Sequence, residues 1–224
     1  MVPAWSYESL LMSLARAFQC HENRNDSTVR LVGILFAPSD SALARTEIVP
    51  SLNYFHHRSG NNIDFYCAGY RRYGYDKRSD ERKVTDHEPP WYFSLLAFEG
   101  LRQEVERRSR WEYSGEADLI LLNGVFDAAS GEADLSWPTA VSCDLDMMVR
   151  HGAITSVRRY FESICQFSEG FDGADPAWSF SDEQGARIAG SALKRLVLSL
   201  LPKKLGDDYR KAEHFAVRDL SRSL

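Results

Sequence analysis

The chain has 224 residues, of which 44% are hydrophobic and 26% are charged, and its formal net charge is −5 at pH 7. A hydrophobic fraction close to the globular average excludes wholesale disorder. The negative charge argues against a dedicated nucleic-acid-binding protein, although a local basic patch can still bind nucleic acid. No stretch reaches about 18 uncharged apolar residues, and the N-terminus has no basic leader. We therefore expect a cytoplasmic protein without a membrane partner.

The four cysteines, Cys20, Cys67, Cys143 and Cys165, are scattered along the chain, and no two of them form a Cys-x-x-Cys pair. Redox pairs and clustered zinc sites need closer spacing. Cys67 and Cys143 lie in apolar strand patterns, so we expect small buried side chains in a reducing compartment.

The first predicted element is a helix over Trp5–Cys20, with Ser6 as its N-cap. Apolar residues recur on one face of this segment at helical spacing. They are Tyr7, Leu10, Leu11, Leu14 and Phe18.

The segment from Arg30 to Tyr70 is predicted to fold as strand, helix and strand. Arg30–Ala37 is a short apolar run typical of a buried strand, and Asn62–Tyr70 is the second strand. Between them, Ser39–His57 has a helical pattern that contains Pro50, and proline predicts a break near Val49 because it lacks a backbone donor. Two strands joined by a helix favour a parallel pair with a right-handed crossover.

A long polar loop is expected over residues 71–88, and Pro89 and Pro90 then start the clearest helix. Its predicted buried stripe comprises Trp91, Leu95, Phe98, Leu101 and Val105. A third strand is predicted over Asp118–Asn123, with Gly124 ending it.

The fourth strand is predicted over Leu135–Met147, because apolar and polar residues alternate in its second half. A helix follows from about Ala153. The hexapeptide Ser-Gly-Glu-Ala-Asp-Leu begins at Ser114 and again at Ser130, which we interpret as one turn chemistry used twice or as coincidence.

Residues 169–224 are predicted to form a helical C-terminal extension packed on a core domain of residues 1–168. Ser181 opens a capping box, and Pro202 ends the helix that follows. Tyr209–Leu220 is a weaker amphipathic helix.

Together these elements predict an α/β fold with a mixed four-stranded sheet flanked by helices, an N-terminal helix and the C-terminal extension. From Arg30 to Phe167 the element order resembles that of a thioredoxin-like fold, in topology alone. The turn at Pro38–Ser41 carries no cysteine, whereas thioredoxin-like redox chemistry needs a thiol there. Other α/β arrangements remain open.

The first candidate catalytic group comprises His56, His57, Asp64 and Cys67. Neutral imidazole titrates near physiological pH, so the histidines can serve acid–base chemistry or bind metal. The alternative is that they complement the negative C-terminal end of a helix.

The second candidate group comprises Asp118, Asp144 and Asp146. Alternate residues of a strand project from one face, so Asp144 and Asp146 are positioned to converge on Mg²⁺ or Mn²⁺, with Asp118 as a third ligand. The alternative is an ordinary solvated strand face.

The third candidate group lies in the loop of residues 71–88, where cations for phosphate alternate with flat rings for bases. It comprises Arg71, Arg72, Tyr73, Tyr75, Lys77 and Arg78. Six basic side chains oppose five acidic ones over residues 71–88, so the net charge of the loop is only +1. A docking loop for another protein is the alternative.

The sequence contains no P-loop, His-Glu-x-x-His or Gly-x-Ser-x-Gly motif. We therefore favour a non-catalytic α/β module that binds another protein through the loop of residues 71–88, with the C-terminal helix as a further candidate surface. Two alternatives remain. One is a metal-dependent hydrolase of a phosphate-containing substrate, and the other is a nucleotide or nucleic-acid sensor.

Overall fold

Strands and helices alternate through much of the chain, and the computed structural model describes residues 2–20, 29–59, 63–72, 80–169 and 217–220. In this part the strands are β1 (Val2–Ala4), β2 (Val29–Phe36), β3 (Ile63–Ala68), β4 (Tyr70–Arg71), β5 (Glu81–Lys83), β6 (Tyr92–Ser94), β7 (Asp118–Asp127), β8 (Glu132–Asp144) and β9 (Val217–Asp219). The helical segments are α1 (Tyr7–Cys20), the π-helix η1 (Ala44–Ile48), the 3-10 helix η2 (Val49–Ser51), α2 (Leu52–Arg58), α3 (Leu95–Arg108), α4 (Leu145–Arg150) and α5 (Val157–Glu169).

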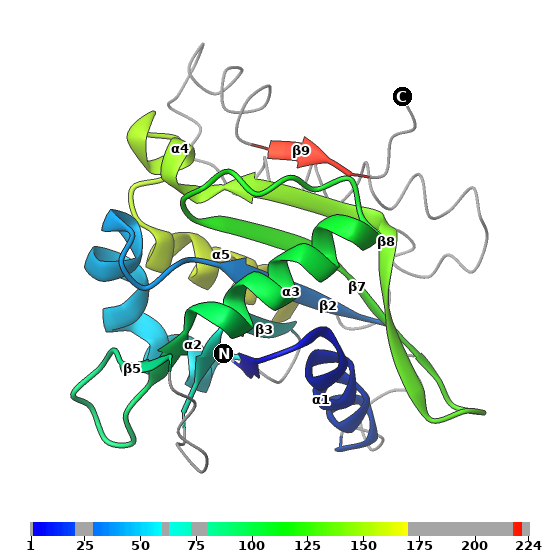
Figure 1. Ribbon diagram of the computed structural model, residues 1–224. Coiled ribbons are helices and arrows are strands. Elements are labelled where there is room, and N and C mark those ends of the chain that lie inside the picture. The colour runs from blue at the N-terminus through cyan, green and yellow to red at the C-terminus, as the bar shows by residue number, and fades with distance from the viewer. Residues whose placement is uncertain (1, 21–28, 60–62, 73–79, 170–216, 221–224) are drawn as a thin grey trace.

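A six-stranded sheet forms the centre of the fold, in the order β1-β3-β2-β7-β8-β9 (Figure 1). β1, β3 and β2 are parallel, and β7, β8 and β9 each run antiparallel to the strand before them in that order. The predicted α/β class with a mixed sheet is confirmed, but the predicted number of four strands is wrong. The short strands β1 and β9 extend the two edges, and the thioredoxin-like element order stays a prediction.

The predicted parallel pair is confirmed, because β2 and β3 pair in parallel from Leu31 opposite Ile63 to Leu35 opposite Cys67. The connection between them breaks where proline removes a backbone donor. The π-helix η1 ends at Ile48, a 3-10 turn contains Pro50, and the regular helix α2 starts only afterwards.

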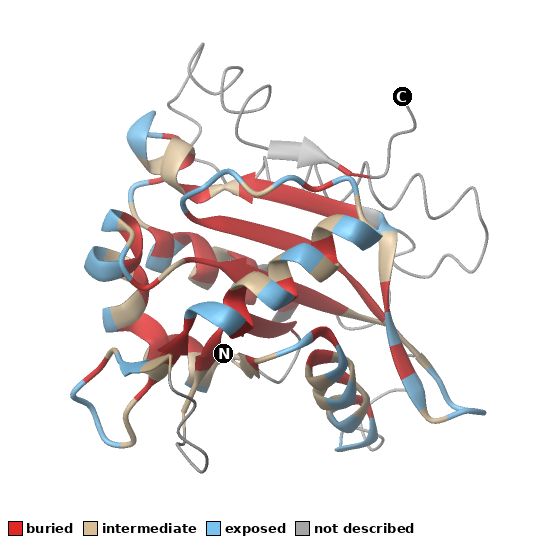
Figure 2. Cartoon of the chain, in the orientation of Figure 1, coloured by how far each residue is buried: buried red, intermediate tan, exposed pale blue. Residues whose placement is uncertain are grey.

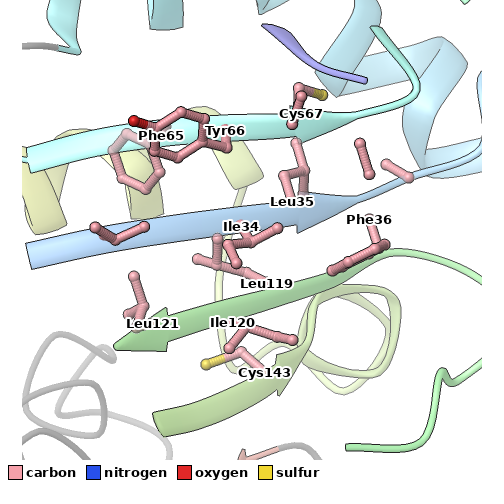
Figure 3. Close-up of a cluster of buried hydrophobic side chains, with 14 of the residues drawn as sticks. Ile34, Leu35, Phe36, Phe65, Tyr66, Cys67, Leu119, Ile120, Leu121 and Cys143 are labelled. Atoms are coloured by element: carbon pink, nitrogen blue, oxygen red, sulfur yellow. The ribbon is translucent and has the colours of Figure 1, made fainter. Parts of the chain in front are cut away.

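Helices cover both faces of the sheet. On one face, Leu14 of α1 packs over Gly124 of β7, and the ring of Phe98 in α3 lies 6.0 Å from that of Phe36 in β2. On the other face, the ring of Phe161 in α5 lies 4.5 Å from that of Phe65 in β3. Figure 3 shows the apolar side chains of β2, β3, β7 and β8 that fill the core.

Part of the predicted loop over residues 71–88 forms a second, three-stranded sheet in the order β4-β6-β5. Gly69 turns the chain into this sheet with a φ of 75°, a conformation that favours glycine. The helix expected directly after Pro90 begins only at Leu95, because β6 comes first. Ser94 then caps α3, since its Oγ accepts a hydrogen bond from the Ala97 N–H at 3.1 Å.

Two predicted strand ends are also wrong. β7 continues through Gly124 to Asp127, because this glycine leaves room for Leu14. β8 ends at Asp144 and does not reach Met147, because Asp144 Oδ1 accepts a hydrogen bond from the Met147 N–H at 2.8 Å and so caps α4.

The N-terminal helix is confirmed, and Ser6 and Ser9 satisfy each other's backbone N–H groups at its start. At the other end of the chain, Val217–Asp219 pairs with β8, so the predicted helix over residues 209–220 is wrong there. The rest of the predicted extension, including the helix from Ser181, lies outside the described residues. Within the described residues, no helix is both long and apolar enough to cross a membrane.

The packing of Phe65 over β2 predicts a large cost for Gly33→Ala. An added Cβ would lie 2.4 Å from Phe65 Cδ1, so the core must shift. We expect the free energy of unfolding, measured by urea denaturation, to fall by about 1–3 kcal/mol. At Gly100, where a Cβ would meet no atom within 4 Å, the same substitution should raise stability by up to about 1 kcal/mol. Equal effects at the two positions would contradict the packing.

Candidate functional site

Open α/β sheets usually bind ligands just beyond the carboxyl ends of their parallel strands, and in this protein Ala37–Asp40 follow the carboxyl end of β2. Here the polar groups at these strand ends contact other groups of the same chain. Ser39 Oγ accepts hydrogen bonds from Arg82 Nε at 3.0 Å and Nη2 at 2.6 Å, and Asp40 lies 3.5 Å from the same guanidinium. The Tyr70 hydroxyl donates to the carbonyl of Ala37 at 2.9 Å. Ser39 Oγ thus accepts hydrogen bonds from a cation. A serine hydroxyl becomes a nucleophile when a neighbouring base takes its proton, and a guanidinium cannot do this.

Arg71, predicted to bind a partner or phosphate, has an internal role in the structure. It forms an ion pair with Glu81, whose side chain is only 2% exposed, and its guanidinium lies 5.1 Å from the centre of the Trp5 ring. Arg72 follows as a half-buried residue. The remaining predicted residues of this group, Tyr73, Tyr75, Lys77 and Arg78, lie outside the described residues.

The first candidate catalytic group is spread over two elements and two faces of the sheet. His56 and His57 lie in the last turn of α2, with their ring centroids 5.6 Å apart. Cys67 is fully buried, and burial raises the pKa of its thiol well above the usual range. Asp64 lies three residues away on the same strand, so it faces the opposite side, where it pairs with Arg30 at 3.2 Å. The structure does not bring these side chains together.

The aspartates of the second group are also used differently from the prediction. Asp146 does not share a strand face with Asp144, because Asp144 caps α4 and Asp146 lies in the first turn of that helix, paired with Arg150. Asp118 lies opposite Asp144 in the strand register. In the described residues, no group of three or more His, Cys, Asp or Glu side chains is arranged to hold a metal ion.

Asp118 is the buried carboxyl of this group, with 2% of its surface exposed. Its Oδ2 accepts hydrogen bonds from Trp111 Nε1 and from the Ser114 N–H, both at 3.0 Å. Burial raises the pKa of Asp118 to about 6, the charge of Asp144 acts in the same direction, and the hydrogen bonds from Ser114 and Trp111 oppose the rise. Asp118 is therefore a polar anchor for the segment between α3 and β7.

The buried cysteines agree with the expectation from the sequence. Cys143 lies in the core, 3.6 Å from the hydroxyl of Tyr160, and burial raises the pKa of its thiol to about 12. A thiol with a raised pKa is a poor nucleophile at neutral pH. Cys165 is buried as well, whereas Cys20 is exposed.

Sequence reasoning missed one feature of the described surface, which is a pair of exposed leucines at the start of α3. Leu95 and Leu96 are 54% and 66% exposed. Leu95 was expected in the buried stripe, but α3 begins after β6 and this places it outside. Asp80 holds this turn, because its Oδ2 accepts hydrogen bonds from Ser94 Oγ and from the Leu96 N–H. Two adjacent leucines directly after a serine cap were the available signal.

Comparisons of the chain with protein-family models, with curated proteins and with solved structures find no match. Among the described groups, the polar residues are mostly engaged within the fold, whereas Leu95 and Leu96 are held outward.

The buried carboxyl of Asp118 predicts a specific pH dependence. Its pKa is about 6 in the folded protein against an ordinary value of 3.8, so the folded state favours the protonated form. The stability that the protonated form contributes is present below pH 3.8 and is lost as the pH rises through 6. The loss is about 2 kcal/mol between pH 4 and pH 7.

Asp118→Asn cannot titrate, so its stability relative to the parent protein should rise by about 2 kcal/mol between pH 4 and pH 7. Urea denaturation at several pH values measures this difference. Asp134→Asn, at the same place in the second copy of the hexapeptide but exposed, is the matched control. A pH-independent difference for Asp118→Asn would contradict the account.

The internal role of Arg71 predicts that Arg71→Ala destabilises the fold. The change leaves the buried carboxylate of Glu81 without this cation, at a cost of about 3 kcal/mol. Adding Glu81→Gln should restore part of the loss, because the buried charge is removed as well. Thermal and urea unfolding measure both effects. If the free energy of unfolding of Arg71→Ala alone lies within about 0.5 kcal/mol of the parent value, the internal role of Arg71 is contradicted.

Proposed function

We propose that the protein is a non-catalytic module that binds another protein, and that its docking surface is the start of α3 with the neighbouring strand β5. This entry surface comprises Leu95, Leu96, Arg82 and Lys83. The observation that carries the proposal is the adjacent pair of leucines, more than half exposed on a regular helix. We also propose the cytoplasm as its location.

The energy of this surface is appropriate for an interface. Fully burying an exposed leucine side chain contributes about 1.5–3 kcal/mol. Leu95 and Leu96 are 54% and 66% exposed, so each can contribute about 1–2 kcal/mol to the central contact of a modest interface. The hydrogen bonds of Asp80 and Ser94 hold the turn before any partner arrives. Such preorganisation reduces the entropy that binding must overcome.

Charged residues lie on the strand beside the start of α3. β5 pairs directly with β6, the strand that leads into α3, and its residues Arg82 and Lys83 have side chains about half exposed. Arg82 pairs with Asp40 and Lys83 pairs with Asp86, so β5 adds little excess charge beside the leucines. Exposed pairs of this kind add little affinity, and they suit a surface whose affinity comes from apolar contact.

The two alternative functions have less support and stay predictions. The metal-dependent hydrolase needs Asp144 and Asp146 on one face of a strand, whereas Asp144 caps α4 and Asp146 lies in the first turn of that helix. For the nucleotide or nucleic-acid sensor, Arg71 is already paired with Glu81.

The proposal predicts a loss of binding when the leucines become polar. The immobilised chain should retain a defined protein from an extract of its native cells, and Leu95→Ser/Leu96→Ser should reduce that retention about tenfold or more, because the central apolar contact is lost. Met12→Ser is the matched control, since Met12 is 58% exposed on α1. Equal retention by the double variant and the parent would refute the entry surface.

A further inference from the structure

Two carboxyl groups lie side by side where the pairing of β7 with β8 ends. Asp118 is directly opposite Asp144 in the strand register. The next residues outward, Ala117 and Leu145, are joined by a hydrogen bond from the Leu145 N–H to the Ala117 carbonyl at 2.8 Å. Antiparallel pairs alternate between hydrogen-bonded and non-hydrogen-bonded positions, so the two aspartates occupy a position of the second kind. Opposite side chains lie closest there, with Cα atoms about 4.5 Å apart.

The two carboxyl groups project from the same face of the sheet, yet their surroundings differ. Asp118 is 2% exposed, and its Oδ2 accepts hydrogen bonds from Trp111 and Ser114. Its Oδ1 is buried and accepts no hydrogen bond within the described part of the chain. Asp144 is half-buried, and its Oδ1 caps α4 by accepting from the Met147 N–H at 2.8 Å. One carboxyl group is thus enclosed with a free oxygen, while the other holds the start of a helix.

The other titratable groups around this pair bring no excess positive charge. Tyr113, before β7, and Cys143 of β8 are neutral at pH 7, because burial raises the pKa of both side chains. The adjoining segments contribute five acidic and three basic side chains, which are Glu99, Glu106, Glu112, Glu116 and Asp146 against Arg102, Arg110 and Arg150. Arg102 pairs with glutamates of α3, and Arg150 pairs with Asp146 of α4. A bound proton is therefore a direct way to reduce the repulsion between the two aspartates.

α4 depends on this corner of the sheet. It has six residues, and a helix of this length has little stability of its own. Figure 1 shows α4 at the end of β8, and Figure 2 shows it with mainly intermediate and exposed residues, beside the buried ends of the strands. Its first turn is held by the cap from Asp144 and by the bond between Leu145 and Ala117. Both contacts involve the carboxyl pair or its immediate neighbours.

We propose that Asp118 and Asp144 share one proton, and that release of this proton to the solvent loosens the start of α4 from β7. The proton lies on Oδ1 of Asp118, because Oδ2 already accepts two hydrogen bonds. With the proton bound, the pair carries one negative charge. Without it, two like charges stand directly opposite each other, which destabilises an antiparallel pair. α4 is then a proton-sensitive element of the fold, and this inference is independent of the entry surface.

Amide hydrogen exchange of the full-length chain, followed by NMR, tests the loosening at the N–H groups of Leu145 and Met147. The pKa of Asp118 is about 6 in the folded protein, and local opening returns it to the ordinary 3.8. The opening equilibrium then rises about tenfold between pH 5 and pH 7, so the protection of both amides should fall about tenfold after correction for intrinsic exchange. The Leu10 N–H makes the first hydrogen bond of α1 and opens by local fraying, so its protection should not follow Asp118.

The shared proton has its own signature in the carboxyl ¹³C shifts. In the parent protein, the shift of Asp144 should change at the same pH as that of Asp118, because coupled groups titrate as a pair. Asp144→Asn keeps a capping side chain but removes the opposing charge, so the midpoint of the Asp118 titration should fall. An unchanged midpoint would show that burial alone acts on Asp118 and would overturn the shared proton.

Asp118→Asn separates the switch from other effects of pH. This side chain is uncharged at every pH, so the protection of Leu145 and Met147 should no longer change between pH 5 and pH 7. Circular dichroism should show that the variant keeps the parent fold. A pH dependence that persists in Asp118→Asn, or an equal fall in protection at Leu10 in the parent, would overturn the assignment of the switch to α4.

Discussion

The contact between the Phe65 ring and the bare backbone of Gly33 is the constraint on which the rest of the structure depends. The ring occupies the place that any side chain at position 33 would need. Phe161 packs on the same ring, and Phe55 of α2 packs on Phe161 with centroids 4.6 Å apart. One glycine in the central strand therefore determines how α2 and α5 lie on their face of the sheet.

The opposite face depends on polar groups that form hydrogen bonds and ion pairs inside the fold. Asp118 binds Trp111 and Ser114 at the start of β7, and Asp64 pairs with Arg30 between β3 and β2. Glu81 holds Arg71 at the small sheet. A buried charge without a partner is costly, so these pairs are needed once the fold has enclosed one member. Among the described candidates, Asp64, Arg71 and Asp118 are therefore part of the framework.

The local elements could be predicted from the sequence, whereas the short strands and the site could not. The strand β2, the helix α1 and the break at Pro50 follow from nearby residues alone. β1 and β9 have three residues each, and they form only because distant segments pair with them. Such pairing leaves almost no local pattern.

The predictions about the site were wrong where an apolar pattern in the sequence continued beyond the true end of a strand or the true start of a helix. The alternation through Cys143 continues to Leu145 and Met147, but Asp144 caps a helix there and Met148 is buried instead. Leu95 fits a helical stripe counted from Trp91, yet the true helix starts after Ser94 and exposes it. In both places, one capping residue changes the direction of every side chain that follows.

The central claim is that α3 presents a docking surface, and site-specific photo-cross-linking tests it most directly. A photoreactive residue placed at position 96 would be activated in native cells, and the same residue at position 12 of α1 would serve as the reference. The account predicts a discrete cross-linked product from position 96, in which the chain is joined to another protein, and none from position 12. No product from position 96, or the same product from both positions, would contradict it.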